Sequence, residues 1–134
     1  MSRSIWLSAS LLAIFSCAAL SAPDVKPAPE PEAATRLKLA RDVFAQMFSR
    51  VTHQQHFDIE DLELWSQHIL ESELDAATTA AERRAAYQAH VARTTSLEKT
   101  AKAFSKTGQG LVSDGLAAEY YRLRAEAQLA KAER

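Results

Sequence analysis

The stretch TGQGLVSDGLAAEYY (residues 107–121) contains all three glycines of the 134-residue chain. Gly108 suits the position just past a helix C-terminus, where a left-handed backbone costs a residue with a β-carbon about 1 kcal/mol or more. Gly110 allows a tight reversal of the chain, and Ser113 or Asp114 can cap a new helix. The stretch therefore predicts the tip of an antiparallel helical hairpin, with Gly108, Gly110 and Asp114 as its tip residues.

Apolar residues recur at helical spacing on both sides of this tip and again earlier in the chain. Asp58 can cap one helix, and Thr79 with Glu82 has the spacing of a capping box for another that runs to about Lys106. We expect the stripes of neighbouring helices to pack together as an interaction seam. Its residues are, in chain order, Phe44, Met47, Leu62, Trp65, Ile69, Leu97, Phe104, Leu116, Tyr120 and Leu123.

The fold class follows from this spacing and from the composition. Proline and glycine are scarce, whereas alanine, leucine, glutamate, arginine and lysine are abundant, as in long helices. The sequence predicts an all-α fold of two tandem antiparallel helical hairpins, about four helices in all.

The two predicted hairpins also resemble each other. The segment FSRVTHQQHFDIEDLELWSQHIL can be aligned with FSKTGQGLVSDGLAAEYYRL if a short gap is placed in the turn. This alignment pairs Phe48 with Phe104, Leu62 with Leu116, and Ile69 with Leu123. It predicts that the second hairpin repeats the first.

Residues 1–22 have the features of a secretory signal peptide. Arg3 precedes the apolar run IWLSASLLAIF, which is too short to span a bilayer. Two processing routes remain open. Ala19 and Ser21 are small residues suited to cleavage into a soluble product, whereas Cys17, the only cysteine, resembles the lipid-attachment cysteine of bacterial lipoproteins.

Residues 23–35 hold all four prolines and are predicted to form a linker. Proline removes backbone hydrogen-bond donors and disfavours helix in the residue before it. The folded helical-hairpin domain is therefore expected to span residues 36–134.

The tip segment resembles a known family. Phe104, Gly108, the run Asp114-Gly115-Leu116 and the pair Ala118-Glu119 are similar to the helix–turn–helix signature of TolC-like outer-membrane efflux proteins. The resemblance covers about residues 97–130 and, more faintly, 41–74. It implies a periplasmic coiled-coil hairpin, and a tandem repeat of such hairpins is the architecture of that family.

The sequence departs from the family in several places. Thr107, Leu111 and Gly115 stand where the family has alanine, serine and a β-branched residue. Alternating apolar and polar strands long enough for a membrane barrel are missing from the sequence. The resemblance therefore implies a hairpin scaffold first, and an efflux role only second.

His53 and His56 are the candidate metal ligands. If the first helix extends that far, the two imidazoles share one face and can bind zinc or copper. The alternative is that both are solvated turn residues. His90, on the seam of the third helix, is expected to be a hydrogen-bonded interface histidine that sets the register.

The remaining features set limits on function. The 16 basic and 17 acidic side chains nearly cancel, so the net charge does not favour binding to nucleic acid or to a membrane surface. Contact with a membrane is expected only through a lipid anchor. No combination of residues indicates catalysis or a cofactor. The alanine-rich seams give a small core, which favours self-association or another helical envelope protein as partner. The sequence predicts a non-enzymatic, exported protein of the periplasm or outer membrane; the alternative is a metal-binding or stress-sensing helical protein.

Overall fold

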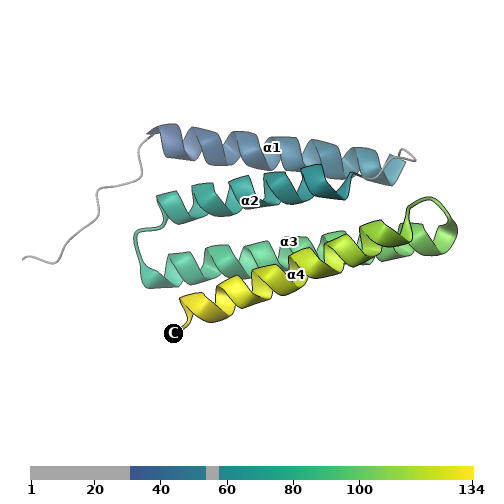
Figure 1. Ribbon diagram of the computed structural model, residues 1–134. Helices are drawn as coiled ribbons and strands as arrows, with labels where there is room; N and C mark the ends of the chain where they lie inside the picture. The colour runs from purple at the N-terminus through teal and green to yellow at the C-terminus, as the bar shows by residue number, and fades with distance from the viewer. Residues whose placement is uncertain (1–30, 54–57) are drawn as a thin grey trace, which may run out of the picture.

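The computed structural model describes residues 31–53 and 58–134. They form four helices: α1 (Pro31–His53), α2 (Ile59–Ala76), α3 (Ala80–Thr107) and α4 (Val112–Ala132). No strand occurs in the described ranges, so the predicted all-α fold is confirmed. The helices form two consecutive antiparallel hairpins, α1–α2 and α3–α4 (Figure 1).

The helices pack in chain order. Each helix lies against the next, and α4 also touches α2. Among the described helices, α1 packs closely on α2 alone. The molecule is thus an open arrangement in which α1 and α4 lie at opposite edges (Figure 1).

The boundary between the predicted linker and the folded domain differs from the prediction. Residues 31–35, which we expected to belong to the linker, are the first residues that the structure describes, and they are helical. Ala33 is buried and belongs to the folded part.

The predicted caps of α2 and α3 are confirmed. The Asp58 carboxylate accepts hydrogen bonds from the amides of Glu60 and Asp61, at 3.1 and 3.0 Å. Thr79 Oγ1 accepts from the Glu82 amide at 3.1 Å, while Glu82 Oε2 accepts from the Thr79 amide at 2.9 Å. These bonds satisfy amides that the first turn of a helix leaves unpaired.

The hairpin tip confirms Gly108 and corrects the cap of α4. Gly108 has φ 72°, in the left-handed region. We expected Ser113 or Asp114 to be the N-cap of α4, but that position belongs to Leu111, and α4 begins at Val112. Asp114, in the first turn of α4, instead accepts a hydrogen bond from the Leu111 amide at 3.1 Å. The chain reverses within residues 108–111, so the helix starts earlier than a side-chain cap would indicate.

Two glycine substitutions at the tip are expected to have opposite effects. At Gly108 no atom lies within 4 Å of an added β-carbon, so Gly108→Ala should cost about 1 kcal/mol through its left-handed backbone alone. At Gly115, inside α4, the nearest atom would be Lys102 Cγ at an ordinary 3.5 Å. Gly115→Ala should therefore stabilise the chain by about 0.5 kcal/mol. Urea denaturation measures both changes, and effects of the same sign would contradict this account.

The main apolar core lies in the half of the molecule nearer the hairpin tip. Leu62 and Leu97 are its largest buried side chains, and all four helices contribute. Several predicted seam residues belong to it or pack against it. These are Phe44, Met47, Leu62, Leu97 and Phe104. Ile69 is also buried, whereas Trp65 is only partly so.

The face that α4 presents to the bundle was predicted wrongly. We expected Leu116, Tyr120 and Leu123 to pack on the preceding helix, but all three are exposed. The buried residues of α4 are Gly115, Ala118 and Ala125. Small residues allow the backbones of α3 and α4 to approach closely, and this packing prevails over burial of the larger side chains. The proposed repeat is therefore unequal, because Leu62 and Ile69 are buried while their counterparts are exposed.

Candidate functional site

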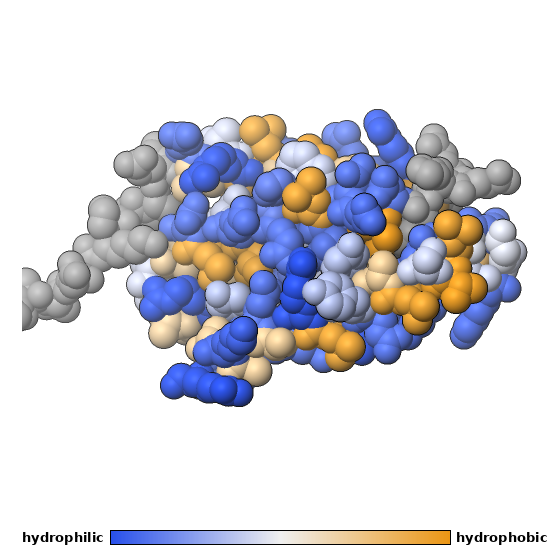
Figure 2. Space-filling view, viewed as in Figure 1, coloured by the Kyte–Doolittle hydropathy of each residue, from blue (hydrophilic) through white to orange (hydrophobic). Residues whose placement is uncertain are grey.

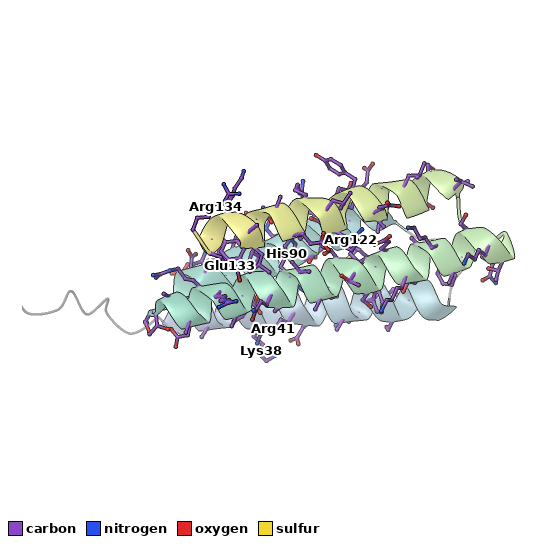
Figure 3. The ribbon with its side chains drawn as sticks, turned by 90° about the horizontal axis from the view of Figure 1, so that it is seen from below. Lys38, Arg41, His90, Arg122, Glu133 and Arg134 are labelled. Carbon is purple, nitrogen blue, oxygen red and sulfur yellow. The ribbon has the colours of Figure 1, made fainter. Side chains whose placement is uncertain are left out.

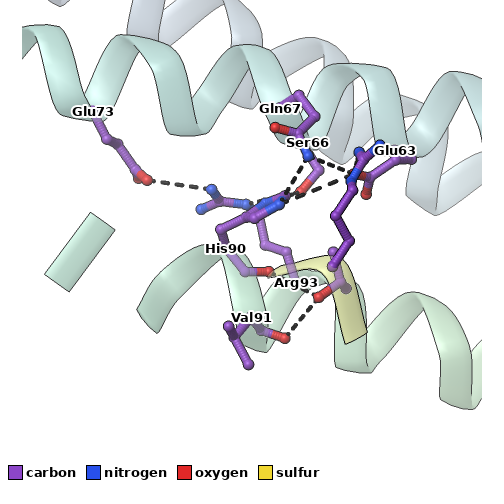
Figure 4. Close-up of polar contacts among 9 residues, drawn as sticks. Glu63, Ser66, Gln67, Glu73, His90, Val91 and Arg93 are labelled. Atoms are coloured by element: carbon purple, nitrogen blue, oxygen red, sulfur yellow. Dashed lines mark hydrogen bonds and ion pairs between the residues drawn. The ribbon is translucent and has the colours of Figure 1, made fainter. Parts of the chain in front are cut away.

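The buried middle of the bundle contains a polar cluster (Figure 4). It joins α2 to α3 and α4 through hydrogen bonds and ion pairs. Its members are Glu63, Ser66, Gln67, Glu73, His90, Arg93, Thr94 and Arg124. We call this set the buried polar cluster.

His90 is at the centre of the buried polar cluster and is 0% exposed. Its Nε2 lies 3.1 Å from Gln67 Nε2, and its Nδ1 lies 3.0 Å from Ser66 Oγ. Because an amide nitrogen only donates, His90 Nε2 must accept, and the ring proton is therefore on Nδ1, which donates to Ser66. The expected position of His90 as a hydrogen-bonded interface histidine is confirmed.

The charge state of His90 follows from its surroundings. Burial and, to a smaller extent, the charges of the nearby Arg93 and Arg124 together lower the pKa of His90 to about 4. The imidazole is therefore neutral near pH 7. Glu63 Oε1 lies 4.0 Å from His90 Nε2, but a neutral ring makes no ion pair with it.

Glu63 is the buried acid of the cluster. Burial raises its pKa, while hydrogen bonds from Gln67 and Arg124 oppose that rise. Glu63 Oε1 accepts from Arg124 Nη2 at 2.6 Å and from Gln67 Nε2 at 2.7 Å. Glu63 Oε2 is buried without a hydrogen-bond partner among residues 31–53 and 58–134.

The buried polar cluster is suited to fixing the register of the helices. Both ring nitrogens of His90 are engaged by protein groups, and the ring has no exposed surface through which a substrate could approach it. In Figure 3 His90 lies in the middle of the bundle, whereas Lys38 points away from it. A network of this kind favours one alignment of α2, α3 and α4 over slipped ones.

A groove of about 410 Å³ lies between α1 and α3, at the end of α2. Five alanines make up much of its lining. Its polar groups are already bonded: Arg41 Nη2 lies 2.8 Å from Glu73 Oε1, and Glu82 is engaged in the cap of α3. The groove therefore offers little that would orient a polar ligand.

The outward face of α4 carries the clearest surface feature. Val112, Leu116, Tyr120 and Leu123 are 71, 64, 61 and 50% exposed. They follow one another at intervals of four, four and three residues, and the exposed Ala127 and Ala130 continue the line. We call these six residues the α4 ridge. Figure 2 shows apolar side chains gathered over the tip and the first turns of α4.

The α4 ridge is a single apolar face along almost the whole helix. A spacing of three and four residues keeps side chains on one side of a helix. Neighbouring exposed apolar residues of this size are unusual on a surface that only meets water. The sequence showed this stripe, but it did not show that the opposite face of α4, which is lined by alanine, would be the buried one.

The other predicted site residues lie at or beyond the limits of the described chain. His53 is the last residue of α1, but its side chain is outside the described part. His56 and Cys17 lie outside the described residues altogether. Within the described ranges, no group of three or more histidine, cysteine, aspartate or glutamate residues could hold a metal ion.

The two-histidine hypothesis has a direct test. A pair of histidines predicts that the wild-type chain binds zinc more tightly than the variant His53→Ala/His56→Ala. Isothermal titration of both chains with zinc measures the difference, and His68→Ala serves as the control because His68 is exposed and remote in sequence. Coinciding curves for the wild type and the double variant would remove the metal site.

Comparisons with protein families, with curated proteins and with solved structures find no match to this chain. Of the described helices, none combines the length and the apolar character that crossing a bilayer requires.

Proposed function

We propose that this chain is a non-enzymatic, exported helical-hairpin protein that acts in the cell envelope through helix–helix contact, with the α4 ridge as its contact surface. The observation that carries the proposal is the exposure of the α4 ridge along successive turns of one helix. Apolar side chains at three- and four-residue spacing are the pattern by which helices recognise helices.

The cellular location in this proposal comes from the sequence. Residues 1–22 have the order of a signal peptide, with Arg3 before a short apolar run and small residues after it. Retention at the outer membrane requires lipid on Cys17; otherwise the chain is a soluble periplasmic protein. An accessory role beside efflux machinery is the finer form of the proposal, and it is supported only by the resemblance of residues 97–130 to TolC-like hairpins.

Export and anchoring can be tested together. The full chain, expressed in a Gram-negative bacterium, is expected in the envelope or periplasmic fraction, and a chain lacking residues 1–22 is expected in the cytoplasm. Labelled palmitate that is incorporated by the wild type but not by Cys17→Ala would establish the anchor. An intact N-terminus on cytoplasmic protein would contradict export.

The contact surface can be tested by photo-cross-linking in intact cells. The variant Tyr120→p-benzoylphenylalanine places the probe on the α4 ridge, and Leu39→p-benzoylphenylalanine is a matched control on α1. The two native residues are 61 and 57% exposed, so access to the probe is comparable. We expect adducts at position 120, identified by mass spectrometry as this chain or another helical envelope protein. Equal labelling at both positions, or none, would contradict the proposal.

A further inference from the structure

The flanks of the α4 ridge carry opposite charges. Glu119, Glu126 and Glu133 lie along one side of it, each seven residues from the next. Arg124 and Lys131, also seven residues apart, lie along the other side. A seven-residue repeat keeps side chains in line beside a coiled-coil seam. The ridge is thus an apolar line with one acidic and one basic border.

This charge arrangement discriminates between the two directions in which a second α4 could pack. In a parallel pair, the acidic border of each helix meets the basic border of the other, five residues further along. Glu126 then faces the partner's Lys131, and by symmetry the same contact occurs twice. In an antiparallel pair, acidic meets acidic and basic meets basic, which is unfavourable.

Contacts within the monomer decide which of these charges are available. Arg124 reaches inward to the buried Glu63 and is largely committed there. Glu126 makes an exposed pair with Arg122 at 2.6 Å, which an additional cation can share. Glu119 and Glu133 are paired within the monomer, with Lys102 and Arg84 respectively. Lys131 belongs to none of the ion pairs among the described residues, so Glu126 with the partner's Lys131 is the favoured contact between chains.

The position of α4 in the fold permits such pairing. It packs on α3 and touches α2, while α1 lies at the far edge of the molecule (Figure 1). The ridge is therefore accessible along its length to a second helix. In a parallel pair, the Pro31 ends of α1 in the two chains also point in the same direction. Two chains that are anchored to one membrane surface require this orientation.

We propose that α4 of one chain pairs in parallel with α4 of a second copy, forming a two-stranded coiled-coil seam along the α4 ridge. This inference rests on the proposed function, because it names the partner of the same surface. Leu116 and Leu123 lie in equivalent layers of the two helices, and the Glu126–Lys131 contacts fix the direction.

Cysteine cross-linking tests the direction. In the full chain carrying Cys17→Ala, the variant Leu116→Cys is expected to form a disulfide-linked dimer under mild oxidation, because the two copies of position 116 face each other in a parallel pair. The control Leu39→Cys should give several-fold less dimer. A cross-link that appears only when Leu116→Cys is mixed with Ala127→Cys would indicate antiparallel pairing and overturn the inference.

Charge exchange tests the proposed contact. Glu126→Lys turns two attractive contacts into repulsive ones and should weaken dimerisation about tenfold in sedimentation equilibrium. Glu126→Lys/Lys131→Glu should restore it, although the pair with Arg122 inside the monomer stays broken. Failure of the double variant to recover would overturn the inference.

The two proposals fail in different ways. Cross-links from position 120 to another protein, together with a monomeric chain in sedimentation, would overturn the self-pairing and leave the contact function standing. A monomeric chain without adducts at position 120 would overturn both. If the Leu116→Cys cross-link forms and Glu126→Lys/Lys131→Glu restores dimerisation, both proposals are supported.

Discussion

Replacing Arg124 with leucine is expected to lower the free energy of unfolding by about 3 kcal/mol at pH 7, because it leaves the Glu63 carboxylate buried without its closest cation. Glu63 Oε1 lies 2.6 Å from Arg124 Nη2, and the Glu63 side chain is only 5% exposed. Gln67 and the field of Arg93 remain, which limits the loss. Urea denaturation at a concentration where the chain is monomeric measures the change.

The control is a substitution that breaks an exposed pair of the same type. Arg36 Nη2 lies 3.1 Å from Asp75 Oδ2 with both side chains more than half exposed, so Arg36→Leu should change stability by less than about 0.5 kcal/mol. Adding Glu63→Leu to Arg124→Leu should recover most of the loss, since no charge is then left buried. Similar losses for Arg124→Leu and Arg36→Leu would contradict the burial argument.

The pH dependence of the Arg124→Leu variant provides a second check. The pKa of Glu63 is already raised by burial, and removing Arg124 raises it further. A carboxyl group whose folded pKa lies above its unfolded value binds its proton more tightly in the folded chain. The stability lost by the variant at pH 7 should therefore return in part as the pH falls toward the unfolded pKa of Glu63.

Much of the fold could be predicted from the sequence because its signals are local. The caps at Asp58 and Thr79 and the left-handed Gly108 depend on residues within one turn of each other, and all three have the expected geometry. Residues 31–35 were assigned to the linker because proline was taken only as a helix breaker, although Pro31 lies in α1.

The packing of α4 could not be predicted from the same rules. Two faces of α4 have helical spacing: the large residues Leu116, Tyr120 and Leu123, and the small residues Ala118 and Ala125. Hydrophobicity favours the first, but close approach of α3 and α4 favours the second. The same face of α4 also carries the partly buried Arg122, whose charge is compensated by Glu98 of α3. A sequence stripe alone does not reveal such compensation.

The buried polar cluster was found only in part. His90 lies on the predicted seam, and its hydrogen-bonded role was expected. Its partners were not, because Ser66 and Gln67 are separated from it by 24 and 23 residues, and Arg124 from Glu63 by 61. Such pairs depend on how helices are aligned in space, and no local spacing in the sequence encodes them.

The titration of His90 is expected to remove about 2 kcal/mol of stability from the wild-type chain between pH 7.5 and pH 5. Burial lowers the pKa of His90 to about 4, against an ordinary value of 6.5. Between these two values the unfolded chain binds the proton and the folded chain does not, so acid favours unfolding. The contribution is complete above pH 6.5 and is lost as the pH falls toward 4. Urea denaturation at the two pH values measures it.

The variant His90→Gln removes this titration and should show a smaller loss between the same two pH values, whatever its stability at pH 7.5. The charged groups that face His90 are Glu63, Arg93 and Arg124. Glu63 is the acid among them, and its raised pKa acts in the opposite direction in both chains, so it largely cancels in the comparison. His68→Gln supplies the control, since it replaces an exposed histidine and leaves His90 and the buried polar cluster in place. If His90→Gln loses as much stability as the wild type, the ring of His90 is protonated in the folded chain, and Gln67 cannot then be donating to its Nε2.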